Sequence, residues 1–393
     1  MTDIDLALAT KARQAAFTAP RSIPYVEAAH MYRPEGMTEE ELKAVSAYNQ
    51  HYETNEKLVW NDLYGHATIL KQYSGYGGPL NGVIPHGTYS PFNGLSGMEL
   101  DTGLPRYYSW LDYEDHYAKE QGKYEVVPMA SPFIYAMANL CYDIKRKGEG
   151  TIFIPYHSTD LWDFDDDWYH LMLTLRKSDY PKPLAVLLFF EDVRKGRHRV
   201  FQKKGIPVYT CGDKFRPEFL YQFIHVVRNF ENVLINDISS PAFYAAYMGK
   251  NVIGHKVWDG FGVRYENNNS PWPHSPNGRA FPDEAYCTMT KPGPEQRALA
   301  QVVLRESAFQ FPEQMKQMFE GGEVCYAIQV SEAEAVHARE ASDDCCQVGQ
   351  EVRWQSEEGV SHGDQEEFDG GEHSEELERQ NVIGCVPEAG TVG

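Results

Sequence analysis

The alternation of apolar and polar positions is clearest in the second half of the chain. Residues 206–210 are β-branched and aromatic, a Cys-Gly-Asp turn follows, and apolar residues at helical spacing run from 217 to 230. The pattern then repeats, with an apolar strand at 232–236 and a helix at 241–248 that stops before Gly249. These units predict two consecutive strand–helix pairs that lead into a further strand at 252–254.

Patterns of the same kind extend the prediction to the rest of the chain. Thr38 and Glu41 have the spacing of a capping box, so a helix is expected to begin after Thr38. The other predicted strands are 57–60, 82–86, 107–111, 124–127, 151–155 and 185–190, and the other predicted helices are 66–73, 113–121, 132–146, 168–175 and one or two helices within 295–319. Because strands alternate with helices, we predict an α/β fold with two similar domains, each a parallel sheet with helices on both faces.

The predicted domains follow from these patterns and from composition. Residues 1–50 are an N-terminal arm, 51–150 a first α/β domain, 151–260 a second one, and 261–330 a loop followed by C-terminal helices. Of the net charge of −21, residues 331–393 carry −14, from 17 acidic and 3 basic side chains. This acidic tail has no apolar period, so we expect it to be disordered, with solubility a simpler role for it than binding a basic partner.

Charge and cysteine content exclude several classes of protein. No basic stretch dominates the sequence, so we expect no nucleic-acid partner. A basic stretch at 194–204 leaves contact with an anionic lipid-linked acceptor, a membrane surface or a donor diphosphate open, beside the simpler interpretation as a solvated helix face. No apolar run has the length of a membrane span, and seven cysteines without paired spacing fit a reducing compartment. We expect a cytoplasmic protein, with the inner face of the membrane as the open alternative.

The start of the helix at 241–248 is the first candidate binding site. Ser240 is the predicted N-cap and Pro241 the first helical residue. A helix N-terminus that follows a strand presents free N–H groups and the positive end of the helix dipole, which suit a phosphate or diphosphate. An ordinary cap without a ligand is the simpler alternative.

Four motifs, in order along residues 55–255, resemble the GT-B glycosyltransferases of bacterial capsule and surface-polysaccharide synthesis. Three are Ile84-Pro85-His86-Gly87, the segment 130–135 (Ala-Ser-Pro-Phe-Ile-Tyr) and the segment 152–159 (Ile-Phe-Ile-Pro-Tyr-His-Ser-Thr). The fourth runs from 215 to 250 and includes Phe219, Phe223, Asn236, Ser240, Tyr244 and Gly249. The sequence Asp237-Ile238-Ser239 departs from the small glycine-containing turn that is more usual in the family, and no clear basic residue stands at the diphosphate position.

The resemblance implies two Rossmann-like domains that face a cleft. In this cleft a sugar is transferred from a nucleotide-sugar donor to a glycan or lipid-linked acceptor. The resemblance implies donor phosphates near Ser239 and Ser240, with the hydroxyls of Ser158 and Thr159 as further phosphate contacts. It also implies nucleotide contacts at Gly212, Asn236 and Tyr244. No cofactor is expected, because the nucleotide sugar is the substrate.

Three residues are candidates for acid–base chemistry. Inverting sugar transfer needs a base that deprotonates the acceptor hydroxyl, and His or a carboxylate can serve. His86 and His157 each follow a predicted strand, where parallel sheets place ligands, although a structural histidine is an equal alternative at both positions. Glu191, with Asp192, ends the next strand and ranks lower, because capping of the following helix explains both residues equally well.

Two further patterns indicate no cofactor site. The acidic run Asp163, Asp165, Asp166 and Asp167 precedes a predicted helix, where acidic residues complement the helix dipole, so we expect no required metal. The glycines at 75, 77 and 78 lack the full dinucleotide-binding spacing and indicate a loop. Two alternatives to a transferase stay open, a nucleotide-sugar epimerase of the same architecture and a non-catalytic scaffold with the acidic tail as its interaction element.

Overall fold

A computed structural model describes residues 32–47, 55–88, 95–140, 147–158, 168–236, 238–254, 285, 288–289 and 291–321. All of them belong to one compact unit, Met1–Gly349. The predicted disorder of residues 331–393 falls outside these ranges, and so do Thr159 and the acidic run at 163–167. The division of the chain into the predicted domains stays a prediction.

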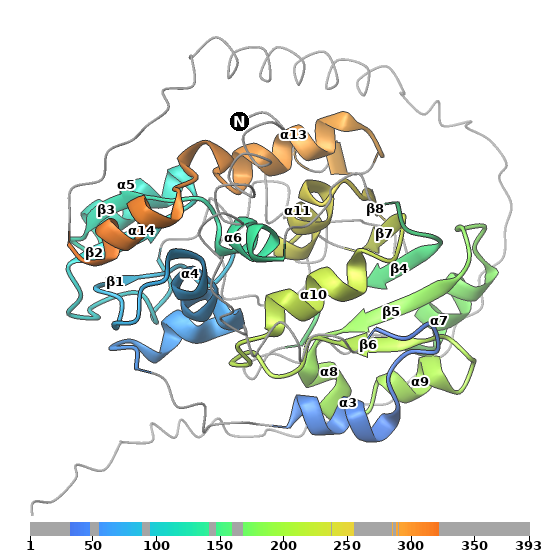
Figure 1. Cartoon of the computed structure of the whole chain (residues 1–393). Helices are drawn as coiled ribbons and strands as arrows, with labels where there is room; N and C mark the ends of the chain where they lie inside the picture. Colours follow the sequence, from blue (N-terminus) through green and yellow to red (C-terminus); the bar gives the residue numbers. More distant parts are fainter. Residues whose placement is uncertain are drawn as a thin grey trace, which may run out of the picture. The chain divides into compact units, whose positions relative to one another are not determined.

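The described chain contains two parallel sheets (Figure 1). The first has three strands in the order β1-β2-β3, which are β1 (Gly82–Val83), β2 (Arg106–Ser109) and β3 (Glu125–Pro128). The second has five strands in the order β6-β5-β4-β7-β8, which are β4 (Thr151–Ile154), β5 (Leu184–Leu188), β6 (Val208–Thr210), β7 (Asn232–Ile235) and β8 (Asn251–Gly254). Every strand pair is parallel, which confirms the predicted α/β class.

The five-stranded sheet has the strand order of a doubly wound Rossmann-like fold. Counted along the chain its strands run 3-2-1-4-5, so the winding direction reverses between β4 and β7. These two central strands pair from Thr151 with Asn232 to Ile154 with Ile235. All four residues of each are buried, as expected for strands whose two faces are both covered by helices.

Helices flank both sheets. In the first half they are α3 (Glu39–Ser46), the 3-10 helix η1 (Val59–Gly65), α4 (His66–Ser74), α5 (Asp112–Glu120) and α6 (Pro132–Asn139). Around the second sheet they are α7 (Trp168–Lys177), α8 (Phe190–Arg194), α9 (His198–Gln202), α10 (Phe219–Val227) and α11 (Ser240–Tyr247). Figure 1 shows α10 and α11 on one side of this sheet, and α8 and α9 with α3 on the other.

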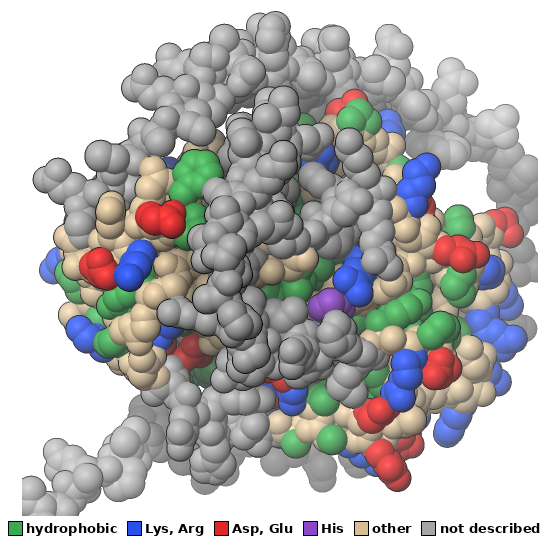
Figure 2. Space-filling model, in the orientation of Figure 1, with side chains coloured by type: hydrophobic (Ala, Val, Ile, Leu, Met, Phe, Trp, Pro, Cys, Tyr) green, Lys and Arg blue, Asp and Glu red, His purple; other side chains and the backbone are tan. Residues whose placement is uncertain are grey.

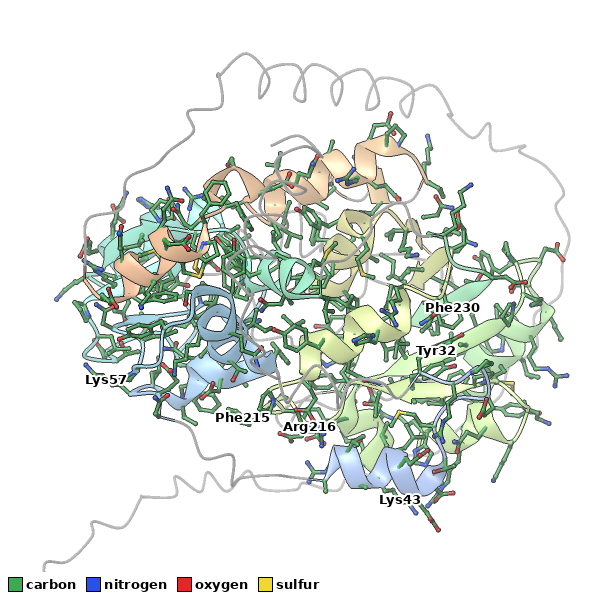
Figure 3. All side chains as sticks on the ribbon, viewed as in Figure 1. Tyr32, Lys43, Lys57, Phe215, Arg216 and Phe230 are labelled. Atoms are coloured by element: carbon green, nitrogen blue, oxygen red, sulfur yellow. The ribbon has the colours of Figure 1, made fainter. Side chains whose placement is uncertain are left out.

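The N-terminal segment packs on the second sheet. The capping box predicted at α3 is present, because Thr38 accepts from the backbone of Glu41 and the Glu41 side chain accepts from the backbone of Thr38. Met37 N–H donates to the Val208 carbonyl at 2.9 Å. The Tyr32 ring stacks on Tyr209 at 5.5 Å and meets the edge of Phe230 (Figure 3). This part of the predicted arm therefore belongs to the packed fold.

The strand predicted at 57–60 is wrong, because that segment enters the 3-10 helix η1. The side chain of Asn61 explains how the segment is held without a strand ladder. Its amide donates to the Gly82 carbonyl and its carbonyl accepts from Ile84 N–H, both at 2.9 Å. One side chain thus bonds the backbone on both sides of Val83 and fixes η1 against β1.

Other predicted elements form with shifted ends. The strand expected at 82–86 is short and ends at Val83, and the strand expected at 185–190 ends at Leu188, so that Phe190 already begins α8. The helix expected from Pro132 is described as far as Asn139. The segment 295–319 forms α13 (Pro294–Val303), the short η2 (Glu306–Ala308) and α14 (Pro312–Phe319).

The C-terminal helices contact both halves of the fold. Helix α13 packs on α11. Its Gln296 side chain forms hydrogen bonds with both the N–H and the carbonyl of Val252 in β8. Further along, Tyr73 in α4 donates to the Gln310 carbonyl at 3.1 Å, and Arg106 in β2 donates to the Met318 carbonyl at 2.9 Å. The chain therefore returns to the first half after leaving the second sheet.

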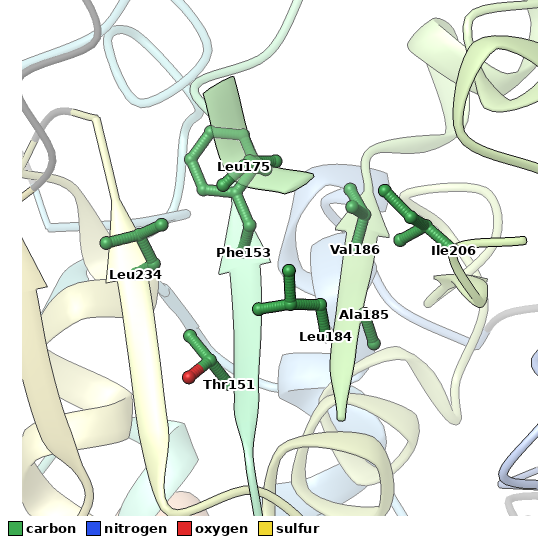
Figure 4. A pocket seen from close by; sticks show the side chains of 8 residues that line it. All are labelled: Thr151, Phe153, Leu175, Leu184, Ala185, Val186, Ile206 and Leu234. Atoms are coloured by element: carbon green, nitrogen blue, oxygen red, sulfur yellow. The ribbon is translucent and has the colours of Figure 1, made fainter. Parts of the chain in front are cut away.

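Two small hollow spaces lie inside the second sheet's core and beside α3. One is lined by apolar side chains of β4, β5 and β7, among them Phe153, Val186 and Leu234 (Figure 4), and has no room for a water molecule. Another, beside Cys211 and Arg216, measures about 10 Å³. Neither has the volume of a nucleotide site.

Candidate functional site

The carboxyl ends of β4 and β7 meet at the reversal point of the second sheet, where doubly wound folds bind ligands. Tyr156 follows β4, and its N–H donates to Asn236 Oδ1, just after β7, at 2.6 Å. Asn236 is 4% exposed, and its amide nitrogen Nδ2 has no hydrogen-bond partner among the residues that the structure describes. A buried donor without a partner is costly, so Asn236 offers an unused hydrogen-bond donor at the expected ligand position.

His157 lies beside this junction and is held by its neighbours. Its ring stacks on Phe189 at 4.0 Å, and its Nδ1 is 2.9 Å from the Ser158 carbonyl oxygen. The Ser158 side chain is fully buried and accepts from Arg197. The structure therefore places the Ser158 hydroxyl against a guanidinium group of the protein itself, and its assigned contact with donor phosphate stays a prediction.

Glu191 and Asp192 lie in the first turn of α8, not at the end of a strand. Both are buried, which excludes the surface caps considered from the sequence. Glu191 pairs with Arg194 at 3.0 Å, whereas Asp192 forms a buried ion pair with Arg197. Burial raises the pKa of Asp192, against the lowering effect of His157, Arg197 and Ser158. This cluster holds the loop after β4 against α8.

The start of α11 differs from the predicted cap. Ser239 is the N-cap residue in extended conformation without a side-chain cap bond, Ser240 is the first helical residue and Pro241 the second. The Ser240 hydroxyl accepts instead from Thr88 N–H at 2.9 Å, a residue that follows β1 in the first half of the chain. Since Pro241 has no N–H, the first turn also offers one donor fewer to a phosphate than an ordinary helix.

Tyr244 lies one turn further along α11, and its hydroxyl bonds to Ser240. It also bonds to Ser131, the N-cap residue of α6. The ring is 4% exposed and stacks on Phe133 at 4.1 Å with an interplanar angle of 9°. Burial raises the pKa of Tyr244 to about 12. Tyr244 thus joins the starts of α6 and α11. Because its side chain is buried and its hydroxyl bonds to protein groups, its contact with a nucleotide stays a prediction.

Gly212 follows the edge strand β6 and lies away from the reversal point. A Cβ at Gly212 would lie 2.8 Å from the Val45 carbonyl oxygen of α3 and 2.4 Å from Arg216. Its φ of +82° also requires glycine. These contacts give Gly212 a structural reason, and its assigned nucleotide contact stays a prediction.

His86 forms a dyad with a carboxylate that the sequence did not single out. Its Nδ1 is 3.3 Å from Oε1 of Glu99, and the backbone N–H of His86 donates to the same oxygen. The His86 side chain is 24% exposed and that of Glu99 is 2% exposed. If Nδ1 carries the proton towards Glu99, Nε2 holds the lone pair, which is the arrangement of a histidine base oriented by a carboxylate.

Behind Glu99 lies a second buried carboxyl group. The Tyr107 hydroxyl is 3.1 Å from Oε2 of Glu99 and 3.4 Å from Oε2 of Glu114. Burial and the charge of Glu99 together raise the pKa of Glu114 well above its ordinary value. No local pattern in the sequence indicates this cluster. Glu99 lies in a turn, Tyr107 in β2 and Glu114 in α5, and these elements meet only in the tertiary fold.

The structure brings the sequence-predicted residues together in two groups. His86 and Ser240 are linked through Thr88, with Tyr244 beside Ser240, while His157, Ser158 and Asn236 meet at the reversal point. Within the described ranges no cluster of His, Cys, Asp and Glu is arranged for a metal, and no helix combines the length and apolar character needed to cross a membrane. On the face in Figure 2, acidic and basic side chains are interspersed.

Three arginines of the basic stretch after β5 form ion pairs within the protein. Arg194 meets Glu191, Arg197 meets Asp192, and Arg199 meets Glu39 of α3 at 2.9 Å. These pairs favour the interpretation of a charged helix face over that of an anion-binding surface.

In comparisons with known proteins, no family model, no curated protein and no solved structure matches this chain.

Proposed function

We propose that this protein is a glycosyltransferase, which moves a sugar from a nucleotide-sugar donor to a hydroxyl group of a glycan or lipid-linked acceptor. The proposal includes a GT-B-like arrangement of the two sheets and a cytoplasmic place of action. The motifs from 84 to 250 support it by resemblance. The single observation that carries it is the dyad of His86 and Glu99 on a loop that bonds, through Thr88, to the first turn of α11.

The chemistry fits this arrangement. A sugar acceptor has a hydroxyl group whose proton must leave as its oxygen attacks, and a histidine oriented by a carboxylate can accept that proton at Nε2. The leaving nucleoside diphosphate needs hydrogen-bond donors near its phosphates. The Ser239 and Ser240 N–H groups at the start of α11 and the unpartnered Nδ2 of Asn236 can supply them.

The test is donor turnover by the full chain. Release of nucleoside diphosphate is measured over a panel of nucleotide sugars, with and without candidate acceptors, for the native protein and for His86→Gln. We expect release with one donor, lowered about 100-fold or more in His86→Gln because the general base is lost. His116→Gln is the matched control, since His116 is an exposed histidine on α5. Equal turnover in His86→Gln and the native protein would remove the base from the proposal.

One observation favours the non-catalytic alternative. The Ser240 hydroxyl, which the resemblance assigns to donor phosphate, is already bonded to Thr88 and Tyr244. A scaffold would retain these bonds and bind no nucleotide. Absence of both turnover and nucleotide binding across the panel would support the scaffold.

A further inference from the structure

The contacts between Glu99, Tyr107 and Glu114 cannot all form with both carboxyl groups ionised. The Tyr107 hydroxyl has one proton and lies within 3.5 Å of a carboxylate oxygen on each side, at 3.1 Å from Glu99 and 3.4 Å from Glu114. The proton can be donated to one of them only, and the shorter distance is to Glu99. The contact with Glu114 is then a hydrogen bond only if Glu114 is the donor, which requires a protonated carboxyl group.

The surroundings of Glu114 agree with a neutral group. Glu114 is 2% exposed, and its second oxygen, Oε1, has no hydrogen-bond partner within the described part of the chain. A buried carboxylate with an unbonded oxygen is costly, whereas a carboxylic acid needs a partner chiefly for its O–H. The apolar cluster formed by Val83, Leu95, Tyr107, Ala118 and Tyr124 lies around the same strand.

The charged neighbours of Glu114 do not reverse this balance. Glu114 faces Glu99, Tyr107, Asp115 and Arg305. Arg305 is the one cation among them, and it is held by both carboxylate oxygens of Asp115 at 3.0 Å. Two carboxylates that share a buried site cannot both ionise easily, and Glu99 has more donors, from His86, Tyr107 and Ser96.

We propose that Glu114 stays protonated at neutral pH and, through the Tyr107 hydroxyl, keeps Glu99 as the carboxylate partner of His86. Glu114 donates to the tyrosine oxygen, Tyr107 donates to Glu99, and Glu99 accepts from Nδ1 of His86. Glu114 and Tyr107 are thus positioning residues, which set the charge state beside the histidine without touching a substrate. This inference rests on the proposed function only in treating His86 as the base.

The first test reads the imidazole itself, in the full chain without ligand. The pKa of His86 is measured by NMR with labelled histidine, its resonance being assigned with His86→Gln. His86 faces Glu99 and His66. Glu99→Gln removes a negative neighbour and is expected to lower the pKa of His86 by about one unit, whereas Glu114→Gln should change it by less than about 0.3 unit because no charge is lost. An equal lowering in both variants would overturn the proposal.

Two tyrosines of the same cluster provide a matched pair. The Tyr107 hydroxyl bonds to the carboxylate of Glu99, whereas the Tyr124 hydroxyl bonds to the backbone carbonyl of the same residue. Tyr107→Phe should raise the pKa of His86, because Glu99 loses a donor and interacts more strongly with the imidazolium. Tyr124→Phe should leave it unchanged. Equal effects of the two variants would contradict the relay through Tyr107.

A direct measurement on the native protein keeps the inference testable if a variant does not fold. Difference infrared spectroscopy should show the carbonyl band of a protonated carboxyl group at neutral pH, which disappears at high pH and is missing from Glu114→Gln. Its absence from the native protein would overturn the proposal. None of these measurements uses a nucleotide sugar, so failure of the relay and failure of the transferase function are separate results.

Discussion

The backbone N–H of Thr88 donates to the hydroxyl of Ser240 at 2.9 Å, and 152 residues separate the two in the chain. Thr88 lies two residues after His86, and Ser240 begins α11, which connects β7 and β8 of the second sheet. One hydrogen bond therefore connects the proposed base with the proposed phosphate-binding helix. Gly87 fits beside it, because a Cβ there would lie 3.4 Å from the same hydroxyl oxygen.

Removing this hydroxyl should loosen the connection. Ser240→Ala leaves the partly buried N–H of Thr88 without its acceptor and removes one partner of the Tyr244 hydroxyl, which together are expected to lower the free energy of unfolding by about 1–2 kcal/mol. Ser239→Ala is the matched control, because Ser239 makes no side-chain cap bond and should cost less than about 0.5 kcal/mol. Denaturant unfolding measures both variants. Similar costs for the two would show that the bond to Thr88 contributes nothing.

Gly65 holds another contact between the two halves. It has a φ of +77°, and a Cβ there would lie 2.2 Å from the carbonyl oxygen of Pro217, in the loop before α10. Gly75 has a similar φ of +71° with open space around it. Gly75→Ala should therefore cost only the backbone strain, about 1 kcal/mol, while Gly65→Ala should cost at least about 2 kcal/mol more. Thermal unfolding of the two variants measures the difference, and equal costs would refute the close approach.

His66 should make stability fall on acidification. Burial, and to a smaller extent His86, lowers the pKa of His66 to about 3. Below the ordinary histidine pKa of about 6.5 the unfolded chain binds a proton that the folded protein refuses, so stability is lost as the pH falls. Between pH 6.5 and pH 5 this amounts to about 1.5 kcal/mol.

The variant His66→Phe should remove this part of the pH dependence. It keeps a ring between Tyr64 and Trp110, the two aromatic neighbours of His66. Unfolding free energies measured at the two pH values should differ by about 1.5 kcal/mol less than in the native protein. An unaltered pH dependence in His66→Phe would mean that His66 takes up its proton in the folded state.

Because Asp192 is buried, its ion pair with Arg197 should be needed for the stability of the fold. Arg197→Met leaves a fully buried carboxylate without its cation and should cost about 3 kcal/mol at neutral pH. Burial already raises the pKa of Asp192, and losing Arg197 raises it further. A raised carboxyl pKa means that stability falls as the pH rises, so the penalty should shrink in acid. Adding Asp192→Asn to Arg197→Met should recover much of the lost free energy of unfolding. If the costs of the two single substitutions simply add in the double variant, the pairing is contradicted.

Local patterns in the sequence predicted those elements that are stabilised by neighbouring residues in the chain. The capping box of Thr38 and Glu41 lies within one turn, and the apolar runs of β4 and β7 need only to be covered on both faces. The predicted N-cap of α11 was wrong by one residue, because Ser239 caps the helix and not Ser240. A Ser-Ser-Pro run allows either serine to be the cap. The hydroxyl of Ser240 is oriented by Thr88, a partner that no local pattern indicates.

The candidate site was predicted in part for the same reason. His86 and His157 follow strands that the sequence shows, so they could be chosen from position alone. Glu99, Tyr107 and Glu114 lie on a turn, a strand and a helix, and their meeting depends on the tertiary fold. Asp192 was assigned to a strand end, but α8 begins two residues earlier and buries it.

The central claim is that a nucleotide sugar binds at the start of α11 and the reversal point of the second sheet. The most direct measurement is the melting temperature of the full chain against a panel of nucleoside diphosphates and nucleotide sugars. A ligand at 100 times its Kd stabilises the folded state by about 2.7 kcal/mol, so one nucleotide should raise the melting temperature by several degrees. Ser239→Glu places a negative charge beside the expected phosphates and keeps the bond between Thr88 and Ser240, so it should abolish the shift, while Ser239→Ala should retain it. A shift that persists in Ser239→Glu, or no shift with any ligand, would contradict the claim.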